Sequence, residues 1–353
     1  MNLSRLSLLL AACLLPATLQ EAHAVTIDWV TVGDTGNVAD TTGYGAVSYE
    51  YRIAKYEVTI QQYTDFLNAV AKSDPYSLYR ENMGDDTSTA GISRTGVSGS
   101  YAYSVIGPFG VNPSGASSPG NRPIAQSVTW FNAARFANWM QNGQGSGSTE
   151  TGAYTLGGAT SGLAPAKNPG AQVYIPTENE WYKAAYFSPM LNSGSGGYYT
   201  YATQSNTAPG NVIGSAANQA NYQHGNYTEG SGENFSVTQA LGFKWNQNYL
   251  SNVGAFISSA SFYGTFDQNG NATEWNDLTG AAGSSRGVRG GGWSGPTDLS
   301  SSDRRTYPPT AFLNAGGFRL ASPVAVPEPS TWVMGLAGIA CGGWEMWRRR
   351  RAR

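Results

Sequence analysis

Cysteine and histidine are nearly absent from this chain of 353 residues. The two cysteines, Cys13 and Cys341, lie in apolar terminal segments that we expect the mature protein to lose. The two histidines are His23, close to the N-terminus, and His224. One remaining histidine and no thiol exclude thiol catalysis, a cysteine-ligated copper or zinc site, and an iron site with two histidines. We therefore expect neither copper nor iron, and no disulfide.

Charge is also scarce, at 12% of the residues, whereas the chain has 45 glycines. Without the two ends, 15 basic and 20 acidic residues remain, so the mature protein is acidic. An acidic protein gives no reason to expect nucleic acid or an anionic membrane surface as a partner. Seven tryptophans also remain, enough to help build a core. The composition is typical of a loop-rich extracellular domain rather than of a disordered chain.

The first 24 residues read as a secretory signal peptide. Arg5 supplies the positive start, residues 6–15 form the apolar core, and Ala22 and Ala24 frame a small-x-small cleavage site. Ten apolar residues are too few to span a bilayer permanently. We expect this signal to be removed, which leaves Val25 as the mature N-terminus.

The C-terminal end, residues 324–353, carries a second export feature. Val326–Pro329 contains Pro-Glu-Pro and precedes an apolar run, 331–347, which can just cross a membrane as a helix before a cluster of arginines. An ordinary tail anchor is one interpretation. The order of the three parts resembles the PEP-CTERM sorting signal of Gram-negative bacteria. That resemblance implies a transient inner-membrane anchor, cleavage by an exosortase-type sorting protease, and delivery to the cell surface or extracellular matrix.

Residues 25–323 remain, enough for one large domain. Apolar residues at helical spacing, each run preceded by a capping threonine, predict three helices. Glycine- and asparagine-rich segments separate them, and no strand–helix–strand alternation is present, so we expect an α+β fold. The predicted helices begin after Thr59, Thr129 and Thr177, and the predicted strands are 25–32 and 49–58.

An oxygen-rich stretch, residues 264–275, is the strongest candidate for a site. Four of its side chains carry oxygen, namely Asp267, Asn269, Asn271 and Glu274. Gly270 lets the backbone turn tightly between them, and Ca²⁺ prefers several carboxylate and carbonyl oxygens on such a loop. An EF-hand is excluded because Ala272 and Leu278 stand where its glycine and its last glutamate belong. The alternative is a polar turn between two strands.

Six sequence blocks together resemble one family. In chain order they are Tyr56–Thr59, Ser127–Trp130, Ile175–Trp181, Gly270–Trp275, Arg289–Trp293 and Gly317–Arg319. They resemble the formylglycine-generating enzyme, or sulfatase-modifying factor, family over roughly the whole mature chain. The resemblance implies a single C-type-lectin-like domain, loop-rich, with few short helices, small antiparallel sheets and bound Ca²⁺.

The resemblance also implies particular calcium ligands. For the first site they are the Asp267 side chain, the backbone carbonyls of Gly270 and Ala272, and the Glu274 carboxylate. A second site would begin at Asn221, with a carbonyl from Tyr222. Independently of calcium, we interpret Arg289 and Arg319 as buried ion-pair partners rather than substrate contacts.

The family's catalytic parts do not carry over. In the oxidase branch two cysteines after the Gly-Gly block bind copper, but residues 294–303 contain none. The sulfoxide-synthase branch uses histidine-bound iron in an additional helical domain, which is absent here. We therefore expect a secreted, calcium-stabilised binding or structural module with a polysaccharide or peptide ligand.

The alternative function is an oxidoreductase of the formylglycine-generating type that acts on protein cysteine or sulfur substrates. A substituted chemistry built on carboxylates is a variant of it, but no spacing marks an acid–base pair. His224 is a possible lone acid–base group, although its glycine- and asparagine-rich surroundings favour a solvated loop. The candidate carboxylates are Asp298, Asp303, Glu178 and Glu180.

Overall fold

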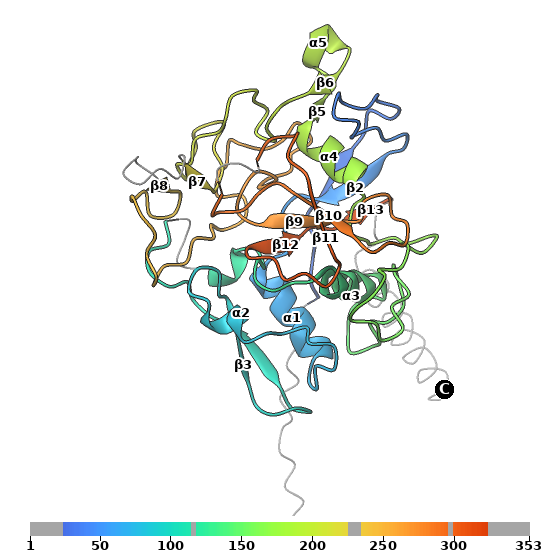
Figure 1. The fold of residues 1–353 in the computed structure, drawn as a ribbon, viewed down its shortest axis with the longest axis vertical. Coiled ribbons are helices and arrows are strands. Elements are labelled where there is room, and N and C mark those ends of the chain that lie inside the picture. The colour runs from blue at the N-terminus through green and yellow to red at the C-terminus, as the bar shows by residue number, and fades with distance from the viewer. Residues whose placement is uncertain (1–23, 114–117, 225–233, 296–298, 324–353) are drawn as a thin grey trace, which may run out of the picture.

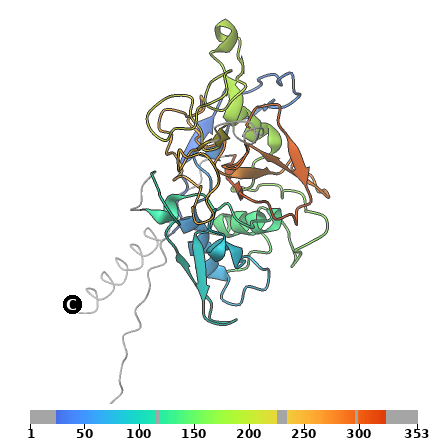
Figure 2. The same cartoon turned by 60° about the vertical axis from the view of Figure 1, so that its left-hand side comes forward.

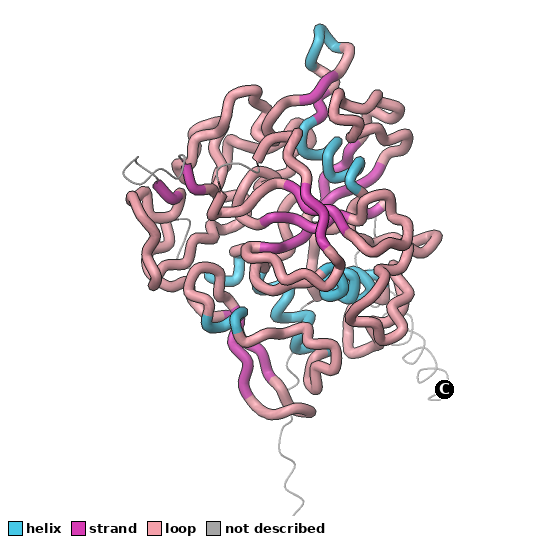
Figure 3. The backbone as a smooth tube through the Cα atoms, viewed as in Figure 1, coloured by secondary structure: helices cyan, strands magenta, loops and turns pink. Residues whose placement is uncertain are grey.

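The computed structural model of the protein describes residues 24–113, 118–224, 234–295 and 299–323. Loops and turns make up most of this path, and the helices and strands are short (Figure 3). No helix within these ranges is long and apolar enough to cross a membrane. The apolar runs 6–15 and 331–347, for which the sequence predicts a signal peptide and a transmembrane helix, lie outside the described residues.

The three predicted helices are confirmed, and each begins after a threonine cap. They are α1 (Ile60–Val70), α3 (Trp130–Gln141) and α4 (Glu178–Tyr186), capped by Thr59, Thr129 and Thr177. Each threonine side chain accepts a hydrogen bond from the backbone N–H three residues later, which satisfies a donor that the helix start leaves without a partner. In α1 and α4 the side chains of Gln62 and Glu180 bond back to the cap's backbone and complete a capping box.

A four-stranded sheet lies at the centre of the molecule, with α1 and α3 on one side and α4 on the other (Figures 1 and 2). Its strand order is β11 (Arg305–Tyr307), β10 (Arg286–Arg289), β9 (Thr273–Asn276) and β12 (Gly316–Phe318). β9, β10 and β11 pair antiparallel, whereas β12 runs parallel to β9. Gly317 of β12 also lies against the backbone at Ile124, outside the sheet, where a Cβ would lie 2.5 Å from the Ile124 carbonyl oxygen, so glycine suits this position.

A second sheet joins the two ends of the domain. Its central strand β2 (Tyr51–Ala54) pairs antiparallel with β1 (Trp29–Val32) and with β13 (Ala321–Ser322). The predicted strands 25–32 and 49–58 are therefore confirmed in part and are shorter than expected. β2 ends at Ala54 because the chain then turns towards the cap of α1 at Thr59.

The remaining elements are short. They are α2 (Asn82–Asp85), η1 (Pro119–Asn121), α5 (Leu191–Gly194) and the strand pairs β3–β4 (Ile92–Thr95, Ala102–Val105), β5–β6 (Phe187–Ser188, Gly197–Tyr198) and β7–β8 (Gln223–His224, Asn234–Phe235).

An aromatic cluster fastens α1 and α3 to the central sheet. Phe66 of α1 meets Phe136 of α3 edge-on at 5.3 Å between ring centroids, and Phe136 meets Phe318 of β12 at 5.4 Å. Tyr63 and Trp139 extend the cluster, and all five side chains are buried. Such pairs add about 0.5–1.5 kcal/mol each beyond the area they bury. The predicted α+β class, loop-rich with few short helices and small antiparallel sheets, is confirmed.

Candidate functional site

The oxygen-rich loop lies against the second predicted calcium segment. Gly270 and Asn221 form a parallel bridge, and the Asn271 amide donates to the carbonyl oxygen of Asn221 at 2.7 Å. Gly270 has φ +82°, and a Cβ there would lie 2.1 Å from that same oxygen, so only glycine fits. The Tyr222 carbonyl accepts hydrogen bonds from Asn211 and Ser236. The structure therefore brings Asn221 to the loop, while the Tyr222 carbonyl is occupied by protein donors.

Glu274 is held by protein groups on both carboxylate oxygens. Arg319 donates from Nε and Nη2 to its two oxygens, each at 2.6 Å, and the Trp181 indole N–H donates to Oε2 at 2.8 Å. Both members of the ion pair are 0% exposed. The interpretation of Arg319 as a buried ion-pair partner is confirmed. Because Arg319 already donates to both oxygens, Glu274 has less capacity for a cation than Asp267, and its role as a calcium ligand stays a prediction.

Asp267 and Glu57 lie close to this ion pair. Asp267 has φ +61°, and its Oδ2 accepts from the Gly254 amide at 2.6 Å. Burial raises the pKa of Asp267 to about 6. Glu57 is 1% exposed and accepts from the Ala272 amide at 3.0 Å and the Asn271 side chain at 3.2 Å. Burial, and then the carboxylates of Asp267 and Glu274, raise the pKa of Glu57 well above its usual range.

These three acidic groups surround one guanidinium, that of Arg319, and the raised pKa of Glu57 favours its neutral form. Glu57 belongs to the 56–59 block and was not among the site residues predicted from the sequence. Among the described residues, no three or more histidine, cysteine, aspartate or glutamate side chains are grouped as metal ligands. Of the two carboxylates in the loop, Glu274 pairs with Arg319, whereas Asp267 accepts from a backbone amide and pairs with no arginine. The hard oxygens of Asp267 therefore fit a cation better than those of Glu274.

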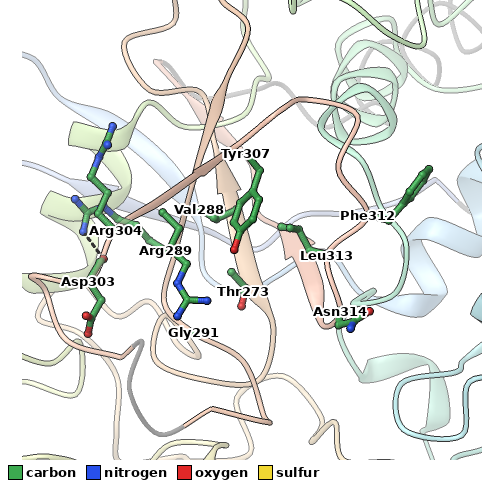
Figure 4. A pocket seen from close by; sticks show the side chains of 11 residues that line it. Thr273, Val288, Arg289, Gly291, Asp303, Arg304, Tyr307, Phe312, Leu313 and Asn314 are labelled. Atoms are coloured by element: carbon green, nitrogen blue, oxygen red, sulfur yellow. Dashed lines mark hydrogen bonds between the residues drawn. The ribbon is translucent and has the colours of Figure 1, made fainter.

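A pocket of about 320 Å³ opens on the face of the central sheet. Its lining residues come from β9, β10, the connection between β10 and β11, β11 itself and the segment before β12: Thr273, Val288, Arg289, Gly291, Asp303, Arg304, Arg305, Tyr307, Phe312, Leu313 and Asn314. Figure 4 shows Asp303, Arg289 and Arg304 on one side and Phe312 and Asn314 on the other, with Tyr307 and Thr273 between them. The pocket thus has a charged wall and an aromatic, amide-bearing wall.

Glu178, the first residue of α4, positions the two arginines of the charged wall. Arg289 donates from Nε to Glu178 Oε1 at 2.8 Å, and Arg304 donates from Nε and Nη2 at 2.8–3.0 Å. The Tyr44 ring lies 4.8 Å from the Arg289 guanidinium and 5.4 Å from that of Arg304. Arg289 is 3% exposed, which confirms it as a buried ion-pair partner, although it also lines the pocket.

The other candidate catalytic groups are not arranged as acid and base. Glu180 accepts from the Thr177 cap and from the Tyr174 hydroxyl at 2.6 Å. Asp303 accepts from the backbone and hydroxyl of Ser300. His224 is exposed on β7, and Asp298 lies outside the described residues. The interval 294–303, which would carry the oxidase cysteines, reaches the pocket at Asp303 and brings no thiol to it.

Solved structures to which this chain is similar include the following three. Treponema denticola variable protein 1 is 17% identical, with a TM-score of 0.48 over 86% of this chain and 97% of that one. CarF is 19% identical, with a TM-score of 0.46 over 85% and 99% of the two chains. PvdO from Pseudomonas aeruginosa is 15% identical, with a TM-score of 0.38 over 84% and 92%. No curated protein matches the sequence.

The sequence also matches a family model over most of its length. The model describes the sulfatase-modifying factor enzyme 1-like domain, and the match covers residues 37–324. It includes all six sequence blocks, both walls of the pocket and the oxygen-rich loop. The chain therefore belongs to the sulfatase-modifying factor enzyme 1-like domain family.

Proposed function

We propose that this protein is an exported, calcium-stabilised binding module, which uses the sulfatase-modifying factor fold to hold a ligand rather than to oxidise one. The observation that carries the proposal is the pocket of about 320 Å³ beside the interval 294–303. Its lining residues offer guanidinium, carboxylate, hydroxyl, amide and aromatic groups, and none is cysteine or histidine. A concave site with a few convergent polar groups suits ligand binding.

Copper chemistry has no support from the residues of this pocket. The resemblance implies that oxidases of the family hold copper through two thiolates, which are soft ligands suited to Cu(I). Ser301, Ser302 and Asp303 instead carry hard oxygens that bind Cu(I) poorly. Glu178 does not compensate as a base, because two arginines already hold its carboxylate.

A turnover assay tests the absence of oxidase activity. The purified mature protein is incubated with copper, oxygen and a peptide that carries the sulfatase cysteine motif, and the peptide is then weighed by mass spectrometry. We expect the cysteine to remain unchanged, as in a metal-only blank, while a family member that has both cysteines converts it. Turnover above the blank would refute the proposal and favour the oxidoreductase alternative.

The calcium part of the proposal rests on the acid-rich cluster around Arg319. Three carboxyl groups lie near one guanidinium, and their mutual repulsion and burial raise the pKa values of Glu57 and Asp267. A divalent cation bound there would favour their ionised forms. Asp267 would hold the ion together with backbone oxygens of the loop that contains Gly270. Glu274 would stay with Arg319.

The export part rests on the two terminal segments of the sequence. Intact-mass measurement on protein recovered from the cell surface tests both ends. We expect a chain that begins at or near Val25 and ends near the Pro-Glu-Pro motif at 327–329. A mass that still includes residues 332–353 would show that the tail is an ordinary membrane anchor and not a cleaved sorting signal.

A further inference from the structure

The charge of the pocket differs in sign from that of the whole mature protein. Arg289 and Arg304 line it and the guanidinium of Arg80 lies 4.0 Å from the Phe312 ring, whereas Asp303 and, behind the wall, Glu178 supply two negative charges. The remaining charge is positive, whereas the mature chain has 15 basic and 20 acidic residues. A basic pocket on an acidic protein favours an anionic ligand, because the local field raises the concentration of anions at the site.

The arginines of the charged wall are held in place before any ligand arrives. Arg304 contacts Glu178 through its Nε and Nη2, and its side chain is 34% exposed. A guanidinium has five N–H donors, so the Nη1 edge points away from Glu178 and can meet a carboxylate. Glu178 and the Tyr44 ring restrict the guanidinium, and so binding a carboxylate costs little side-chain entropy.

The opposite wall suits a sugar ring. Tyr307 and Phe312 present aromatic surface, and the C–H groups of a sugar are attracted to the negative face of such a ring. The Arg80 guanidinium lies over one face of Phe312, so the sugar would use the opposite face and the Tyr307 ring. Asn314, Thr273 and the Tyr307 hydroxyl can exchange hydrogen bonds with sugar hydroxyls. The volume of about 320 Å³ is at the small end for ligand pockets.

A peptide fits this site less well. Peptides that bind beside a sheet add a strand along an exposed edge, and their affinity comes from a row of backbone hydrogen bonds. The edge strand next to the pocket is β11, Arg305–Tyr307, which is only 3 residues long. A strand of that length offers few such bonds, whereas a compact pocket holds one or two sugar units.

We infer that the pocket lined by Arg289, Arg304, Tyr307 and Phe312 binds a carboxylate-bearing sugar unit, that is, a uronate of an acidic polysaccharide. The uronate carboxylate pairs with Arg304, and its ring lies against the aromatic wall. This inference rests on the proposed function, since it names the ligand class of the same pocket.

Calorimetric titration of the mature protein tests the inference with three probes of equal length. The probes are a uronate trisaccharide, a neutral glucose trisaccharide and a triglutamate peptide. We expect the uronate to bind at least about tenfold more tightly than either of the others, because charge-assisted hydrogen bonds exceed neutral ones. We also expect its affinity to fall as the salt concentration rises.

Variants locate the binding in this pocket. Arg304→Gln should lower the affinity for the uronate about tenfold or more and leave the affinity for the neutral sugar unchanged. Arg94→Gln, at an arginine paired with Glu81 on the surface, is the matched control and should change nothing. Phe312→Ala, which removes a half-exposed ring, should also lower the affinity for the uronate. This variant provides the test if Arg304→Gln does not fold.

Each outcome separates this inference from the proposed function. Equal binding of neutral and acidic sugars, or no effect of Arg304→Gln and Phe312→Ala, would overturn the uronate inference and leave a binding module. Preference for triglutamate would replace the sugar with an acidic peptide. Failure of the uronate to bind at millimolar concentration would also overturn it. Peptide-cysteine turnover in the copper assay would instead overturn the proposed function itself.

Discussion

Arg319 links the sequence blocks Gly317–Arg319 and Gly270–Trp275, because it directly follows β12 and its guanidinium binds the Glu274 carboxylate of β9. Removal of either partner leaves a charge that is fully buried, so Arg319→Met and Glu274→Gln should each cost about 3–5 kcal/mol of unfolding free energy. The double variant should cost less than the sum of the two, since it leaves no uncompensated charge. Urea denaturation measures all three. A cost below about 1 kcal/mol for both single variants would mean that the pair is not a structural link.

Lys183 gives a pH signature at a single residue. Its side chain is 0% exposed, and its Nζ donates to the Asp34 carbonyl oxygen at 2.9 Å. Burial lowers the pKa of Lys183 from the ordinary lysine value to about 8. Between these two pKa values, Lys183 keeps its proton in the unfolded chain and loses it in the folded protein. The contribution of Lys183 to the free energy of unfolding therefore rises with pH in this range.

Comparison of the wild type with Lys183→Met isolates the effect of Lys183 from that of other groups that titrate in the same pH range. The stability difference should shift in favour of the wild type between pH 7 and pH 9.5, as the buried ammonium loses its proton. Denaturant unfolding at both values measures the shift. A difference that does not change with pH would show that Lys183 keeps an ordinary pKa in the folded protein.

At the scale of elements, the cap of α4 matters because this helix also carries Glu178. Thr177→Ala removes the hydroxyl that accepts from the Glu180 amide and should cost about 1 kcal/mol of unfolding free energy. Thr177→Ser keeps a hydroxyl and is the matched control, with a cost of a few tenths. Thermal unfolding of both variants measures the difference. Equal stability of the two would show that the cap contributes nothing.

The oxygen-rich loop 264–275 gives a second prediction at this scale. If calcium binds the folded loop, a chelator should lower the melting temperature by linkage. Asp267→Asn should abolish that response. Glu274→Gln should lower the melting temperature but keep the response, because Arg319 and not the ion holds that carboxylate. A chelator that leaves the wild type unchanged would identify the loop as an ordinary polar turn.

The sequence predicted the three longer helices because their signals are local. A threonine cap and apolar residues at a spacing of three and four need no distant partner. The parallel pairing of β12 with β9 could not be predicted, since it joins Gly316–Phe318 to Thr273–Trp275 across the intervening strands β10 and β11. Strand pairs of two residues, such as β5–β6, are too short to leave a periodic pattern.

The candidate site was predicted only in part, for a related reason. Asp267, Gly270 and Glu274 stand close together in sequence, so their shared chemistry was visible. Glu57 was missed because it lies some two hundred residues earlier, at the end of a predicted strand. Its burial without a chelating arginine becomes evident only in the fold. The pocket likewise depends on the sheet order that brings β9, β10 and β11 together.

At the scale of the whole molecule, the chain belongs to the family, yet the interval 294–303 contains no cysteine. The core, the helix caps and the buried arginines account for the sequence blocks that the chain shares with the family, since each block supplies a cap, a strand or an ion pair. None of these contacts involves a thiol. The lining of the pocket likewise contains arginines and aromatic rings and no cysteine.

Metal content tests this account most directly. The purified mature protein is exposed to excess Cu(I) under reducing conditions, desalted and analysed for copper by mass spectrometry, beside a family member that has both cysteines. The account predicts copper at the level of the buffer blank, because hard oxygens and one exposed histidine do not retain Cu(I). Stoichiometric copper that survives desalting would contradict it and would reveal a soft-ligand site in a chain that has no mature thiol.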